Sequence, residues 1–275
     1  MTAVAQSGRL PLGRWALNGA AGVSLFFIML PLLLVSWLAF FRQEIPSFPP
    51  EGYSLKWFGA VFNTQSFVGG FILSTQVAVA ATLLGLAIAV PASLAVARRQ
   101  FLGRGAIATL LLLPLVVPGV VLGTAIYVFQ IEAEVATSLP LLGSTWGLVL
   151  AHALIVIPWA ARLVTASLAG FDPAIEEAAK NLGAGPFTTF RRITVPAIWP
   201  GIVAGALFGF VTSFSNLEMS LFLVGAGRTT LPIAILQYLE WKIDPTVAAV
   251  SVMQILLIGI AMIITDRYVK ISKVV

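Results

Sequence analysis

Two ionisable side chains, His152 and Glu218, stand inside long apolar stretches of this 275-residue chain. His152 is the single histidine and cysteine is absent, which excludes a multi-histidine site, a thiolate metal site and a disulfide framework. No nucleophile–base pair or metal-ligand cluster accompanies either residue, so catalysis and metal binding are not expected. A lone histidine in a membrane span is a functional candidate or a packed, hydrogen-bonded residue, and both interpretations of His152 stay open.

Glu218 is the residue best suited to bind a charged solute. An uncompensated carboxylate inside a bilayer costs about 3 kcal/mol on insertion scales. It therefore needs a water-lined cavity, protonation, or a cationic partner such as Arg228. A position on a substrate path and a position at the outer membrane interface are both compatible with the sequence.

Other polar residues accompany Glu218. At about 100° per residue, a helix places Thr212, Ser215 and Asn216 on roughly one face, with Glu218 about 60° beyond Ser215. We predict that these four residues, with Tyr127 from an earlier span, line a substrate path.

A polar stretch of the distal half, residues 169–196, is predicted to form two short helices. Asp172 suits an N-cap and Pro173 a first helical residue. Gly183 suits a left-handed residue that ends the first helix, and Pro186 begins the second. Two short helices at a fixed angle transmit displacement instead of absorbing it, so this stretch is predicted to couple the chain to a partner. An ordinary amphipathic cytoplasmic loop is the alternative.

The residues predicted to make that coupling contact are small or acidic. Small side chains permit close insertion into a groove, and acidic residues in the first turns suit the helix dipole. The coupling set is Glu176, Glu177, Ala178, Ala179, Gly183, Ala184 and Pro186.

The elements that carry these residues are predicted to be membrane-spanning helices. The chain is 59% hydrophobic and 10% charged, with a mean hydropathy of +0.99, whereas soluble domains are about 25% charged. Its charge-free runs reach the roughly 20 residues that a helix needs to cross a bilayer, and they lack the alternation of a barrel strand. We expect an all-α fold with a tail at 1–16 and one transmembrane domain at 17–275. The predicted spans are Leu17–Phe41, Phe67–Val96, Ala106–Gln130, Trp146–Leu168, Ala197–Val224 and Thr246–Thr265.

Charge distribution orients these spans. With the N-terminus inside, twelve Lys and Arg residues fall on the cytoplasmic side and four outside, as the positive-inside rule requires. Both termini are then cytoplasmic, and the basic charge gives no reason to expect nucleic acid as a partner. The outside residues are Arg42, Lys56, Arg228 and Lys242.

Glycine and proline mark close packing and bending. Gly201, Gly205 and Gly209 recur every fourth residue, a spacing that lets another helix approach backbone to backbone. Pro114 and Pro118 are expected to bend the third span, either at a transport path or as simple kinked packing.

A short glycine-rich stretch lies after the fifth predicted span. Residues 225–230, GAGRTT, resemble a phosphate loop but lack its lysine and fall outside the membrane. We therefore expect no ATP site and no bound cofactor in this chain.

The coupling stretch resembles a known motif. Residues 177–196 read E-A-A-x₃-G-x₉-I-x-V-P, which is similar to the E-A-A-x₃-G-x₉-I-x-L-P loop of binding-protein-dependent ABC importer permeases, with Val195 in place of Leu. The similarity extends over about residues 67–268. The proline-broken third span, the SFSNLEMSLFLVG segment and Thr229–Pro232 resemble the smaller permease of spermidine/putrescine-type transporters.

This resemblance implies a type I ABC importer permease fold with the coupling loop between helices 4 and 5. It implies a bacterial inner-membrane complex of two permease subunits, expected to be a heterodimer, with two ATPase subunits that bind ATP and Mg²⁺. A periplasmic or lipid-anchored binding protein would deliver the substrate. Glu177, Ala178, Ala179 and Gly183 would dock into an ATPase groove, and this chain would be non-catalytic.

The resemblance narrows the substrate only in part. Asn216 stands where such permeases can carry Asp, which weakens the case for a dication, and the branch also serves opines, amino-acid derivatives, phosphonates and ferric ion. We expect a small cationic or zwitterionic, polyamine-like solute. A stand-alone secondary transporter or channel would need inverted repeats or midplane charges, and a membrane enzyme would need paired acid–base groups.

Overall fold

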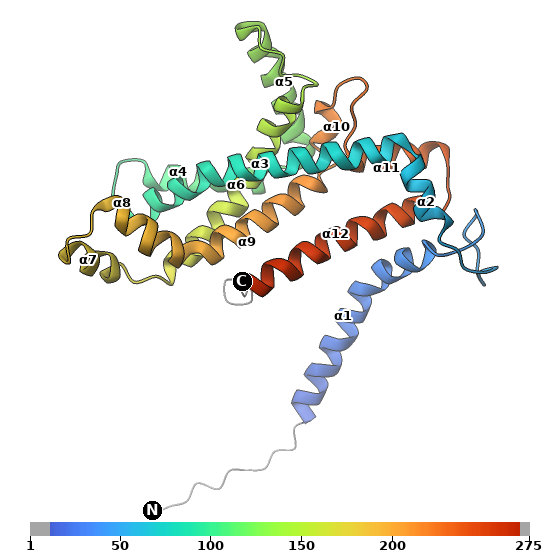
Figure 1. Ribbon diagram of the computed structural model, residues 1–275, viewed down its shortest axis with the longest axis horizontal. Helices are drawn as coiled ribbons and strands as arrows, with labels where there is room; N and C mark the ends of the chain where they lie inside the picture. The colour runs from blue at the N-terminus through green and yellow to red at the C-terminus, as the bar shows by residue number, and fades with distance from the viewer. Residues whose placement is uncertain (1–11, 270–275) are drawn as a thin grey trace, which may run out of the picture. The chain divides into compact units, whose positions relative to one another are not determined.

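The computed structural model describes residues 12–269, and its regular elements in that range are helices (Figure 1). Six helices are long and apolar enough to cross a membrane, which confirms the predicted all-α architecture. They cover Arg14–Leu38, Gln65–Arg98, Gly119–Thr137, Thr145–Ala169, Pro186–Phe214 and Thr246–Arg267. Residues 12–16, assigned to the tail from the sequence, belong to the first helix, and residues 1–11 lie outside the described range.

The described residues form two compact units: 12–61 with 243–253, and 62–242 with 254–269. In the first unit, α1 (Leu12–Leu38) leads into a segment that folds back on itself, where the Arg42 N–H donates to the Gly52 carbonyl at 2.9 Å. Trp57, in α2 (Lys56–Asn63), is buried and its indole N–H donates to the Phe41 carbonyl at 2.6 Å. The helix α12 (Thr246–Val269) contributes to both units.

The second unit is built on three mutually packed helices: α3 (Gln65–Arg98), α6 (Thr145–Ala169) and α9 (Val195–Phe214). The helix α11 (Leu231–Trp241) packs against α3. Figure 1 shows α3 and α9 running alongside α6, the most buried of the six spans. His152 lies on α6 and Thr212 lies on α9.

Glycines set the distance between α6 and α9. A Cβ atom on Gly205 would lie 3.0 Å from Ala160 Cα, and one on Gly209 would lie 2.7 Å from Val156 Cγ1. Gly201 lies against Leu163 and Ser167 of α6 in the same way. The three glycines of the sequence stripe therefore face α6 of the same chain.

The third predicted span is broken, not bent. It divides into α4 (Arg104–Leu112), a 3₁₀ turn η1 (Leu113–Leu115) and α5 (Gly119–Thr137). Pro118 has ψ 135°, outside the helical range, so the chain turns before α5 begins. The helix α5 also continues to Thr137. The predicted end of this span at Gln130 is therefore wrong.

The fifth predicted span also differs. A continuous helix runs from α8 (Pro186–Thr189) through a π-helical turn η2 (Phe190–Thr194) into α9 and ends at Phe214. Residues 215–219 leave the helix before α10 (Ser220–Leu223) begins. The helical face extrapolated from Thr212 to Glu218 is therefore wrong beyond Phe214.

Side-chain hydrogen bonds explain this second break. The Asn216 Oδ1 accepts from the Met219 N–H at 3.0 Å, and the Ser220 hydroxyl donates to the Asn216 carbonyl at 2.8 Å. Such local bonds compete with the hydrogen-bond ladder of a helix. Asn216 thus bonds the residues at which α10 begins, and it does not continue α9.

Candidate functional site

The two broken spans meet at Glu218. Its carboxylate lies beside Gly119, the first residue of α5, where a methyl group in place of the glycine hydrogen would overlap it. One turn later, a Cβ atom on Gly123 would lie 2.9 Å from the Phe222 ring and 3.0 Å from Met219 Cα. The Glu218 side chain is exposed. An exposed carboxylate at the start of a helix is favoured by the helix dipole and is available to a cation.

His152 holds the segment that carries Glu218. It is fully buried on α6, with Nδ1 at 2.8 Å from the Ser213 hydroxyl and Nε2 at 3.1 Å from the Ser220 hydroxyl. Ser213 precedes the break and Ser220 follows it, so one imidazole joins both ends of residues 215–219. Because the Ser220 hydroxyl donates to Asn216, it accepts from Nε2–H, and in the neutral ring Nδ1 accepts from Ser213.

The other residues predicted to line the path are placed differently. The Ser215 hydroxyl accepts from the Gln254 amide of α12 at 3.3 Å, and the Asn216 Oδ1 accepts from the N–H of Met219, the residue that precedes α10. Thr212 is half-buried on α9, and Tyr127 is 36% exposed on α5. The structure thus brings Glu218 to α5 and gives Ser215 and Asn216 partners within the chain.

Gly119 and Gly123 were missed as site residues. They stand four apart directly after Pro118, and this spacing of small residues is the signal that could have identified a close helix contact.

The coupling loop has the predicted capping geometry. The Asp172 carboxylate accepts from the Ala174 N–H at 2.9 Å where α7 (Ala174–Asn181) begins. Gly183 has φ +86°, and its N–H donates to the Lys180 carbonyl at 2.9 Å. The Ala184 N–H donates to the Ala179 carbonyl at 3.0 Å, which completes a Schellman motif. The predicted end of the first helix at Gly183 is thus confirmed, whereas α7 begins one residue later than predicted, at Ala174, and the predicted second short helix is instead the first part of the long helix Pro186–Phe214.

Glu176 of the coupling set is half-buried and contacts residues of its own chain. Its Oε1 accepts from the Thr194 hydroxyl at 2.7 Å and lies 3.7 Å from Arg98 Nη2 at the end of α3. The Arg98 guanidinium also lies over the Phe171 ring, 5.2 Å from its centroid. Glu176 therefore fastens the loop to α3 and η2.

The surface of the coupling loop is apolar as well as acidic. Glu177, Ala178, Gly183 and Pro186 are exposed, whereas Ala179 and Ala184 are half-buried. Leu182 and Phe187, 89% and 73% exposed, were missed from the sequence. Their apolar character within a polar stretch is the signal for them, because exposed apolar side chains mark interaction sites.

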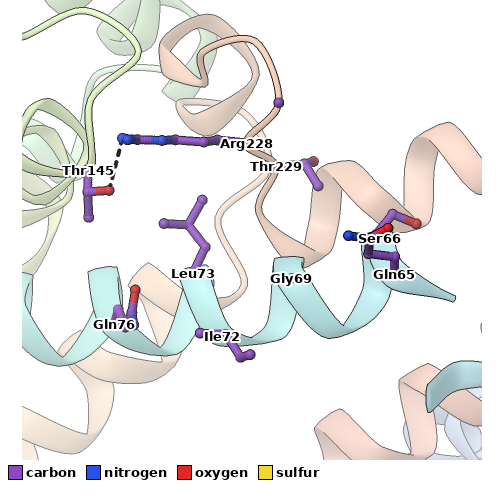
Figure 2. Close-up of a pocket in the computed structure, with 10 residues that line it drawn as sticks. Gln65, Ser66, Gly69, Ile72, Leu73, Gln76, Thr145, Arg228 and Thr229 are labelled. Atoms are coloured by element: carbon purple, nitrogen blue, oxygen red, sulfur yellow. Dashed lines mark hydrogen bonds between the residues drawn. The ribbon is translucent and has the colours of Figure 1, made fainter. Parts of the chain in front are cut away.

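A hollow of about 590 Å³ with a mixed polar and apolar lining lies at the N-terminal end of α3, and we call it the outer hollow after the side of the membrane that the sequence predicts for it. Figure 2 shows the Arg228 side chain extending over α3 towards Thr145, and its Nη1 donates to the Thr145 hydroxyl at 3.2 Å. Arg228 thus has a partner other than Glu218, the pairing that the sequence left open. The lining residues are Gln65, Ser66, Gly69, Ile72, Leu73, Gln76, Thr145, Gly227, Arg228 and Thr229.

Metal binding has no support from the described residues. Among residues 12–269, no group of three or more His, Asp or Glu side chains is arranged to hold a metal ion.

Comparison with known proteins identifies the family. Residues 81–271 match the binding-protein-dependent transport system inner membrane component family. Over 219 residues, 80% of this chain and 82% of the relative, the chain is 26% identical to the spermidine/putrescine transport system permease protein PotC of Haemophilus influenzae. It is 31% identical over 265 residues, 92% of each protein, to the molybdenum transport system permease protein ModB of Mycobacterium bovis.

A solved structure shares the fold. It is a bacterial alginate ABC transporter in complex with an alginate pentasaccharide-bound periplasmic protein, with a TM-score of 0.71, 16% identity and 94% of each chain covered. Because the family match covers most of the chain, the protein belongs to the binding-protein-dependent transport family as a multi-pass inner-membrane permease subunit of an ABC importer.

Proposed function

We propose that this subunit forms half of the translocation pathway for a small cationic or zwitterionic organic solute. The observation that supports this is the exposed Glu218 carboxylate where two broken spans meet. Broken helices are recurrent substrate sites in transporters because their freed backbone groups face a cavity. The polyamine named for one relative is a cation, in accord with a carboxylate on the path.

The rest of the proposed complex follows the family. A second permease, expected to make a heterodimer, completes the path, and two ATPase subunits bind ATP and Mg²⁺. An external binding protein, periplasmic or lipid-anchored, delivers the solute. Both termini are cytoplasmic, and Leu182, Phe187 and Glu177 meet the ATPase. This arrangement is supported by the inside excess of Lys and Arg and by the exposed apolar residues of the loop.

The substrate path is tested by Glu218→Gln, which keeps the size of the side chain and removes its charge. We expect uptake of the solute retained by the cognate binding protein to fall about tenfold or more, as for the loss of a charge contact worth about 1.4 kcal/mol. Uptake is measured with the labelled solute in vesicles that contain the complete transporter. Glu132→Gln, at an exposed position near the far end of α5, is the matched control. Wild-type uptake by Glu218→Gln would remove this residue from the path.

A further inference from the structure

The face of α3 that lines the outer hollow is mixed: it carries polar residues beside the apolar Ile72 and Leu73. Gln65, Ser66, Gly69 and Gln76 are exposed on this face. Gln65 and Gln76 are separated by about 16 Å along the helix, at 1.5 Å per residue. Primary amides in contact with lipid would lack hydrogen-bond partners, at a cost of several kcal/mol each. This face of α3 is therefore suited to contact water or a polar ligand.

The opposite wall is a glycine turn that directs Arg228 into the hollow. A Cβ atom on Gly225 would lie 2.8 Å from Gly143 Cα, so the two backbones touch. Gly227 has φ +73°, and the Arg228 N–H donates to the Gly225 carbonyl at 3.1 Å. The GAGRTT stretch, which cannot serve as a nucleotide loop, thus has a structural role: it holds one guanidinium over α3.

The chemistry of the outer hollow is that of an anion site. Arg228 is the only charged residue among those that line it. Of its side-chain N–H groups, the Nη1 donor bonds to Thr145, a contact that orients the guanidinium plane. A planar guanidinium matches the two oxygens of a carboxylate, and the amide and hydroxyl groups around it can bond the rest of a polar molecule. Arg228 also stands on the membrane side where basic residues are scarce.

We propose that the outer hollow binds the carboxylate of a small organic solute, with Arg228 as its ionic partner. A volume of about 590 Å³ lies within the range of small-molecule sites. The proposal rests on the proposed transport function and narrows it: a molecule recognised by a guanidinium at the outer hollow and by Glu218 at the helix breaks is zwitterionic. A dicationic solute, the alternative, would be bound by Glu218 without Arg228.

The test compares two probes with carbon chains of equal length, γ-aminobutyrate and putrescine. Binding of each to the complete transporter in lipid nanodiscs, without the binding protein, is measured by titration with ligand-observed NMR. We expect γ-aminobutyrate to bind the wild type, and Arg228→Gln to weaken it about tenfold or more, while putrescine binding is unchanged by the substitution. Arg42→Gln, which changes an exposed arginine that is not among the residues lining the hollow, is the matched control and should bind both probes as the wild type does.

Two results would overturn the proposal. The first is no binding of γ-aminobutyrate to the wild type, and the second is equal binding of γ-aminobutyrate by Arg228→Gln and the wild type. If the second result is accompanied, in a separate titration with the binding protein, by weaker association of that protein with Arg228→Gln, the hollow would be assigned to an acidic side chain of that partner. The uptake assay of Glu218→Gln is independent of this test. If that variant takes up the solute as the wild type does while Arg228 still binds the carboxylate, the proposal for the substrate path is wrong and the anion site stands.

Discussion

At the scale of single residues, the hydrogen bonds of His152 decide where Glu218 stands. The imidazole joins Ser213 and Ser220 across the break, and no other side chain in the described range is seen to bond both ends. His152→Leu would leave the buried Ser213 hydroxyl without this partner, at about 1–3 kcal/mol, and the Ser220 hydroxyl with its bond to the Asn216 carbonyl. We expect residues 215–219 to lose their fixed position and the apparent affinity for the solute to weaken more than the maximal uptake rate.

Because the chain has no cysteine, this prediction has a direct structural readout. Glu218→Cys introduces a unique thiol, and its rate of modification by a membrane-impermeant reagent should change several-fold when His152→Leu is added. His152→Gln, which can still reach one serine, should restore part of the wild-type rate. Ser93→Ala removes a buried hydroxyl that bonds Ala161, elsewhere in the bundle, and should leave the rate unchanged. Equal rates in all four backgrounds would show that His152 does not position Glu218.

At the scale of elements, the coupling loop divides its carboxylates between two tasks. Glu176 bonds Thr194 and lies near Arg98, whereas Glu177 is exposed beside Ala178. We therefore expect Glu177→Lys to insert into the membrane normally but to lose the ATPase, since a charge reversal at a docked surface costs several kcal/mol. Co-purification of the ATPase with the tagged permease measures this. Glu132→Lys, which reverses an exposed charge outside the coupling loop, is the control. Retention of the ATPase by Glu177→Lys would refute the docking assignment.

The elements differ in how far the sequence predicts them. The loop helices were predictable because Asp172 and Gly183 act on backbone groups within a few residues of themselves. The length of the apolar runs was enough to count the spans. The break after Phe214 was not predictable in this way, since no proline or glycine stands between Phe210 and Val224. Beside the local bonds of Asn216, the two ends of the break are joined by His152, which lies about sixty residues earlier in the chain and meets this segment only in the folded state.

The candidate site shows the same limit. Pro118 predicted a bend in the third span, but the contact between Gly119 and Glu218 is seen only in the structure. Helical spacing grouped Ser215 and Asn216 with Glu218, whereas their side chains bond Gln254 and the start of α10. Local sequence rules therefore locate breaks and caps, and contacts between distant spans select which polar residues stay free for a solute.

At the scale of the whole molecule, the predicted topology places the outer hollow on one side of the membrane and the coupling loop on the other. The loop around Leu182 follows the fourth span, and the glycine turn at Ala226 follows the fifth, so one crossing separates them. The excess of Lys and Arg on the segments that lie on the same side of the membrane as the termini predicts that the loop faces the cytoplasm. Leu182→Cys and Ala226→Cys place unique thiols at two exposed positions. We expect an impermeant thiol reagent to label Ala226→Cys in right-side-out vesicles and Leu182→Cys only in inverted ones. Labelling of both thiols from the same side would contradict the crossing between them, and the reverse pattern would place both termini and the coupling loop outside, away from any source of ATP.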